Sequence, residues 1–65
     1  MKTPKFVVIQ FGPAHYSWEL RAGNGSVFAY SREIYSRKRD ALRAINRVTK
    51  AVETVQEVEY RPLHN

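Results

Sequence analysis

Residues 16–30 read YSWELRAGNGSVFAY, and this stretch decides the fold. In residues 16–22 apolar and polar side chains alternate with a period of two, which is typical of a β-strand with one buried face. The Asn24–Gly25 pair is typical of a two-residue type I′ hairpin turn, because both residues tolerate a positive φ. Residues 26–30 supply the returning strand. The stretch therefore predicts an antiparallel β-hairpin.

A two-residue loop would also fix the register of this hairpin. It places Leu20 opposite Ala29, on the same face as Tyr16 and Trp18. We expect these two aromatic side chains in the core, because their alternation matches burial rather than an exposed stacking platform. The opposite face of the hairpin then carries two cross-strand pairs, Arg21 with Phe28 and Glu19 with Tyr30.

The flanking sequence predicts three more elements. Residues 6–11 are β-branched and aromatic and form a first strand. Ser36 is a suitable N-cap for a helix from about Arg37 to Ala51. Residues 54–60 form a last strand. The expected fold is α+β, a β-β-β-α-β unit in which one helix packs on one face of an antiparallel sheet, within a single domain over residues 1–65.

The predicted helix has two different sides. At about 100° per residue, an apolar side includes Ile45, which we expect to face Trp18 across the sheet. The opposite side carries four cations within an arc of about 80°. We call these four residues the basic stripe: Arg39, Arg43, Arg47 and Lys50.

The formal net charge of +5 is concentrated in one window, residues 32–50. This window holds seven basic and two acidic residues, and the charges elsewhere cancel. A local positive patch favours a polyanion as partner, so we expect binding to the phosphates of DNA or RNA. A merely solvated helix face is the alternative. The residues expected to contact nucleic acid are Arg37, Lys38, Arg39, Arg43, Arg47 and Lys50.

Catalysis, metals and membranes are not indicated by the sequence. It has no cysteine and no phosphate-binding loop, nucleophile elbow or HExxH motif. His15 is most simply a loop residue, and the acids Glu57 and Glu59 suit an edge strand. The longest apolar run is residues 6–9, far too short to span a membrane. We expect a non-enzymatic cytoplasmic protein without cofactor or metal.

The segment Ser31–Lys38, together with the Asn24–Gly25 turn, resembles the YegP-like family of small proteins of unknown function. Members show an Asn-Gly turn, a short strand and a Tyr-Ser-x-Lys helix start, matched here by Tyr35, Ser36 and Lys38. A spaced apolar pattern in the helix also matches, through Ala41, Ala44, Ile45 and Val48.

The resemblance implies a unit that pairs with a second copy by exchanging C-terminal strands. One copy of the unit is present here, so a homodimer is implied, with Val55, Val58 and Tyr60 on the exchanged strand. The small size of the chain also favours a partner, because 65 residues support only a small core. The family supplies no catalytic activity.

A protein-interaction module is the second expected function. In a dimer with both helices on one side of the sheet, the other face stays open. Its exposed aromatic residues rimmed by charge would suit an unidentified protein partner. The residues expected on this alternative partner face are Arg21, Phe28 and Tyr30.

Overall fold

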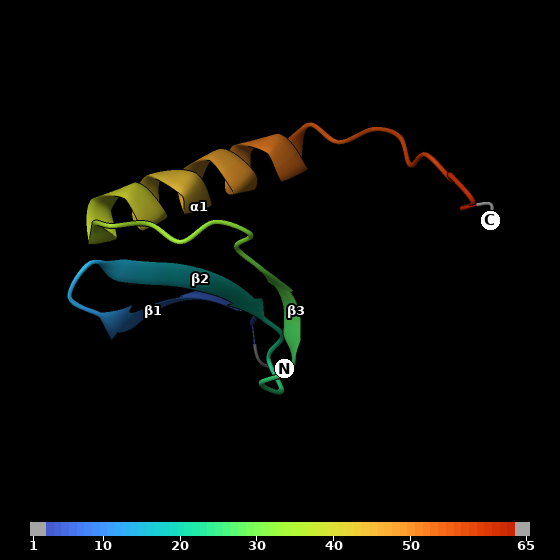
Figure 1. Ribbon diagram of the computed structural model, residues 1–65. Coiled ribbons are helices and arrows are strands. Elements are labelled where there is room, and N and C mark those ends of the chain that lie inside the picture. The colour runs from blue at the N-terminus through green and yellow to red at the C-terminus, as the bar shows by residue number, and fades with distance from the viewer. Residues whose placement is uncertain (1–2, 64–65) are drawn as a thin grey trace.

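Three antiparallel strands form the sheet: β1 (Lys5–Gly12), β2 (His15–Arg21) and β3 (Val27–Tyr30). The computed structural model describes residues 3–63 and orders the strands β1-β2-β3. Helix α1 (Lys38–Glu53) lies along one face of this sheet (Figure 1). The predicted α+β class is therefore confirmed, as is the order of the three strands and the helix.

The core lies between α1 and the two longer strands, on which the helix packs. Trp18 of β2 is only 8% exposed, and Ala41 of α1 is fully buried. The Phe6 ring meets the Trp18 ring edge-on, with 5.6 Å between the ring centroids. The prediction that Trp18 belongs to the core is confirmed. Ile45, which was expected to face Trp18, is only half-buried.

The hairpin turn differs from the predicted type I′ turn. Gly25 has a φ of +93°, and no non-glycine residue among residues 3–63 has a positive φ, so Asn24 is not left-handed. The Ala22 N–H donates to the Ser26 carbonyl (2.8 Å) across a three-residue loop. The Asn24 side-chain oxygen accepts a hydrogen bond from the Ser26 N–H (3.0 Å). Asn24 thus shapes the loop through its side chain, and Gly25 alone supplies the positive φ.

The longer loop is accompanied by a β-bulge in β3. Glu19 pairs with Tyr30 as predicted, and so does Leu20 with Ala29, but Arg21 pairs with Val27. The predicted pairing of Arg21 with Phe28 is therefore wrong, because Phe28 is the extra residue at this bulge.

The segment between β3 and α1, residues 31–37, stays hydrogen-bonded to β2 at two points without forming a regular strand. The Ser31 N–H donates to the Trp18 carbonyl (2.8 Å), and the Ser31 hydroxyl accepts from the Trp18 N–H (3.1 Å). Tyr35 then forms an isolated bridge with Tyr16. This second contact brings the chain to the start of β2, above which α1 begins. The helix N-cap is Arg37, without a side-chain cap, and not Ser36 as predicted.

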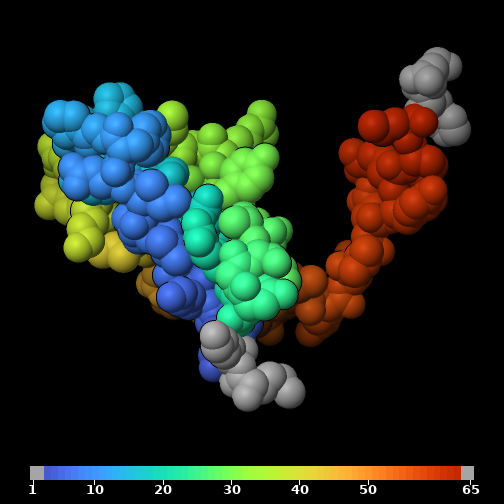
Figure 2. Space-filling model, turned by 90° about the horizontal axis from the view of Figure 1, so that it is seen from below, coloured from blue at the N-terminus to red at the C-terminus, as the bar shows by residue number. Residues whose placement is uncertain are grey.

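The segment after α1 does not form the predicted fourth strand in this chain. Residues 54–63, which we call the tail, pair with no strand of the described sheet. Figures 1 and 2 show the tail projecting away from the sheet and helix. The helix ends at Glu53, and the N–H of its C-cap residue, Thr54, donates to the Ala51 carbonyl (3.1 Å). Residues 55–63 contain no turn that would bring the tail back to the sheet.

The close packing at Ala41 predicts that a larger side chain there destabilises the protein. Ala41→Leu should lower the free energy of unfolding by about 1–3 kcal/mol, since added methylenes force the helix away from the sheet. Thermal unfolding followed by circular dichroism, at matched protein concentrations, measures this. Asn46→Leu, at an exposed position of the same helix, is the control and should change stability by less than about 0.5 kcal/mol. Equal stability of the two variants would show that α1 does not approach the sheet closely at Ala41.

The positive φ at Gly25 makes a second substitution informative. Gly25→Ala should cost about 1–2 kcal/mol, because a Cβ disfavours this backbone conformation. A Cβ there would meet no heavy atom within 4 Å, so the cost is confined to the backbone. Gly25→Asn should be less destabilising in urea unfolding, since Asn tolerates positive φ better. Loss of less than about 0.3 kcal/mol for the alanine variant would contradict the observed turn.

Candidate functional site

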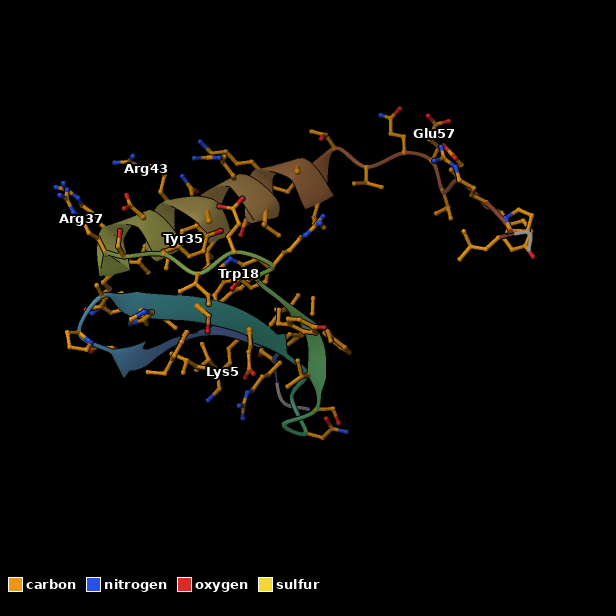
Figure 3. The ribbon with its side chains drawn as sticks, in the orientation of Figure 1. Lys5, Trp18, Tyr35, Arg37, Arg43 and Glu57 are labelled. Carbon is orange, nitrogen blue, oxygen red and sulfur yellow. The ribbon has the colours of Figure 1, made fainter. Side chains whose placement is uncertain are left out.

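The basic stripe is fully presented to solvent on the outer side of α1. Its four residues are all exposed, and they lie opposite the buried Ala41 on the helix circumference. Figure 3 shows Arg43 pointing away from the sheet. From Arg39 to Lys50 the stripe extends about 16 Å along the helix axis. One strand of B-DNA presents about five phosphates over that length.

No carboxylate neutralises the stripe among residues 3–63. The ion pairs in this part of the chain join Arg21 to Glu19 and Arg61 to Glu59. The acid of the first helical turn, Asp40, is half-buried and lies about 60° around the helix from Arg43, but it forms no ion pair in this part of the chain. The stripe thus remains a row of unpaired cations.

Arg37 and Lys38, the two residues at the helix start that were predicted to contact nucleic acid, lie in different positions relative to the basic stripe. Arg37 is exposed at the N-cap and extends beyond the first turn (Figure 3). Lys38 is also exposed, but it lies about 100° around the helix from Arg39, on the side away from the rest of the stripe. A flat polyanion on the stripe would therefore meet Arg37 more readily than Lys38.

The sheet face opposite α1 carries the predicted alternative partner residues. Side chains alternate along a strand, so the burial of Trp18 under α1 places Glu19 and Arg21 on the other face. There the Arg21 guanidinium donates two hydrogen bonds to one oxygen of Glu19, at 2.9 and 2.7 Å. Phe28 and Tyr30 are 62% and 74% exposed. We call this surface the open face.

Sequence reasoning missed two residues of the open face. Lys5 and Val27 both pair with Arg21, so all three share this side of the sheet. Figure 3 shows Lys5 pointing away from the helix. Lys5 could have been predicted on this face if the pairing of β1 with β2 had been worked out from the sequence, because it lies opposite Arg21. Val27 could not be found in this way, because the predicted register without a bulge places it on the helix side of the sheet.

The predicted assembly residues are all exposed on the tail. Val58 and Tyr60 are 93% and 87% exposed, and Val55 is exposed as well. Leu63, at the far end of the tail, was missed by the sequence prediction although it is equally uncovered. The tail thus presents an apolar series to solvent, accompanied by the acids Glu57 and Glu59.

His15 lies at the start of β2, next to an aromatic ring of β1. Its ring lies 5.6 Å from the Phe11 ring, centroid to centroid, beside the β1–β2 turn. The described residues contain no group of three or more His, Asp or Glu side chains arranged to hold a metal ion. Within residues 3–63 there is also no helix with the length and apolarity needed to cross a membrane.

Comparison with known proteins places the chain in a family. The family described as "Domain of unknown function (DUF1508)" matches residues 14–59, from the start of β2 to the middle of the tail. The chain belongs to this family, the YegP-like family. The predicted resemblance is therefore confirmed.

A solved structure supports the same fold. The solution structure of a protein from Haloferax volcanii, determined by NMR, superposes on the chain with a TM-score of 0.75 and 28% sequence identity. The match covers 92% of this chain and all of the Haloferax chain. No curated protein matches the sequence.

Proposed function

We propose that this DUF1508 protein is a homodimer that binds the phosphates of DNA or RNA through the basic stripe of each α1. The carrying observation is a row of four exposed cations opposite the buried side of α1, without an acidic partner in the described chain. This role is binding rather than catalysis.

The large solvent-accessible area of the single chain supports the proposal that it associates with a second copy. A compact monomer of 7.6 kDa exposes about 4,300 Å². This chain exposes 5992 Å², an excess of about 1,700 Å². Two chains burying that excess would remove about 3,400 Å², within the range of obligate dimers. The radius of gyration, 14.2 Å, also exceeds the value of about 11 Å for a compact chain of this length.

The composition of the exposed surface supports exchange of the tail. In the tail, Val58 and Tyr60 alternate with Glu57 and Glu59, and the tail has no strand partner among the described residues. In Figure 2 it stands clear of the rest of the molecule on the side of β3. A three-stranded sheet leaves the outer edges of β1 and β3 available, and an extended segment of a second chain can add to such an edge.

The core of the single chain also contains one buried hydrogen-bond donor without a partner among the described residues. The Trp18 indole N–H is buried and has no hydrogen-bond acceptor among the described residues. Leaving a buried donor unpaired costs about 1–3 kcal/mol. Among residues 3–63, only Trp18 and Ala41 are apolar residues with buried side chains. A second chain would enlarge this core.

The proposed assembly predicts the mass and the effect of removing the tail. Light scattering at micromolar concentration should give the mass of two chains. A chain ending at Glu53 should lose cooperative thermal unfolding, because the exchanged strand completes the core. The double substitution Lys5→Glu with Lys38→Glu, at exposed positions outside the tail, should remain a dimer. A folded full-length monomer would contradict the assembly.

The proposed binding site predicts a salt-dependent affinity for duplex DNA. If four to six phosphates are neutralised, log K should fall against log salt with a slope of about −4 to −5. Arg43→Glu with Arg47→Glu should abolish this binding with little change in thermal stability, because both residues are exposed. Fluorescence anisotropy with a labelled duplex measures both effects.

The control for this test has the same change in net charge. Lys5→Glu with Lys38→Glu also removes two cations and adds two acids, but neither residue is on the basic stripe. It should weaken duplex binding much less than the stripe variant. Equal losses for the two variants would mean that only overall charge matters. Unchanged binding by the stripe variant would eliminate the stripe as the site.

A further inference from the structure

The open face has a composition that the basic stripe does not share. It combines two exposed aromatic rings, Phe28 and Tyr30, with the cationic residues Lys5 and Arg21. We propose that this face is a second binding surface, which takes single-stranded nucleic acid by stacking unpaired bases on Phe28 and Tyr30. The proposal rests on the proposed function only for the class of partner, since its residues lie on the other side of the molecule.

The two rings lie on one strand at a useful spacing. Phe28 and Tyr30 are two residues apart on β3, so their backbone positions are about 6.8 Å apart. This is twice the rise of about 3.4 Å between stacked nucleotides in one strand of DNA. Each ring therefore has room to stack on a different base of an unwound strand.

The charges of the open face, two cations and one acid, favour a negatively charged partner. Its acid, Glu19, is held by two hydrogen bonds from Arg21, which reduces its repulsion of phosphate. Lys5 lies beside Arg21 in the register and takes part in neither ion pair of the described chain. A strand crossing from β3 toward β1 would pass from the aromatic rings to Lys5, the unpaired cation of the face, and aromatic rings beside positive charge are the combination that single-strand binding surfaces use.

The β-bulge contributes to this arrangement. Without it, Val27 would lie on the helix side and Phe28 would face Arg21 directly. With it, the pairing puts Val27 on the open face beside Arg21 and leaves Phe28 as the extra residue of the edge strand. Phe28 and Tyr30 both lie on the edge strand of the sheet, where a flexible strand can reach their rings.

A duplex would not use this face in the same way, because its bases are already stacked on one another. Phosphate contacts alone serve duplex and single strand alike, whereas ring stacking requires unpaired bases. The open face is thus expected to prefer a single strand, and the basic stripe is expected to accept a duplex.

The test compares two double variants of the full-length protein at the same positions. Phe28→Leu with Tyr30→Leu keeps apolar side chains but removes both rings. Phe28→Tyr with Tyr30→Phe exchanges the rings and keeps stacking. The probes are labelled oligo-dT and a labelled duplex of the same length, measured by fluorescence anisotropy at about 50 mM salt.

The expected result separates the two variants. Stacking changes affinity by about 5- to 150-fold per base, so the leucine variant should bind oligo-dT at least about tenfold more weakly than wild type. The exchanged-ring variant should bind within about twofold of wild type. Both variants should bind the duplex as wild type does, and unchanged thermal unfolding should verify their fold.

Three results would overturn the inference: no oligo-dT binding by wild type, equal oligo-dT affinity of the leucine variant and wild type, or an equal loss of duplex binding. A face that instead captured a protein through its apolar side chains would give one of the first two results.

The Arg43→Glu with Arg47→Glu variant distinguishes this inference from the proposed function. If that variant keeps duplex binding while the leucine variant loses oligo-dT, the stripe fails and the open face stands.

Discussion

The burial of Trp18 under α1 is the constraint on which the rest of the structure depends. Trp18 belongs to the central strand, and the helix packs on that strand and on β1. Because side chains alternate along a strand, this one burial assigns every neighbour on β2 to a face. It also orients the helix, since Ala41 is the residue that makes the close approach. The outward direction of the basic stripe and the composition of the open face both follow from it.

A core of two buried residues is small for a cooperative fold. The helix and the sheet can cover only one face each within a single chain, and the tail covers neither. Apolar surface left in water is a driving force for association. The same property that makes the isolated chain marginal therefore supplies the area on which a second copy would form its contacts.

The charges are divided among three parts of the molecule in a way that suits separate tasks. The helix carries unpaired cations, the open face pairs its acid with Arg21, and the tail carries the acids Glu57 and Glu59 among apolar side chains. A helix face can hold a row of cations at low cost when they point into water. In the tail, the two acids alternate with the apolar side chains of Val58 and Tyr60.

The sequence by itself determined the three strands, the helix and its two sides, because alternation with a period of two and recurrence near 3.6 are properties of neighbouring residues. It also determined the family, through Tyr35, Ser36 and the spaced helix residues that follow. The positions of the candidate residues on the basic stripe needed only the helical angle of about 100°.

Only the tertiary structure decided the conformation of the hairpin turn, the position of the β-bulge and whether the tail pairs with a strand. Asn24 had two ways to form a turn, by positive φ or by its side chain, and the bonding to Ser26 selected the second. The resulting bulge at Phe28 changed the face of Val27, which local alternation cannot foresee. Residues 54–60 have the pattern of a strand, but a strand exists only where another strand supplies its hydrogen bonds. Within residues 3–63 no strand does so, and the tail leads away from the sheet after the end of α1.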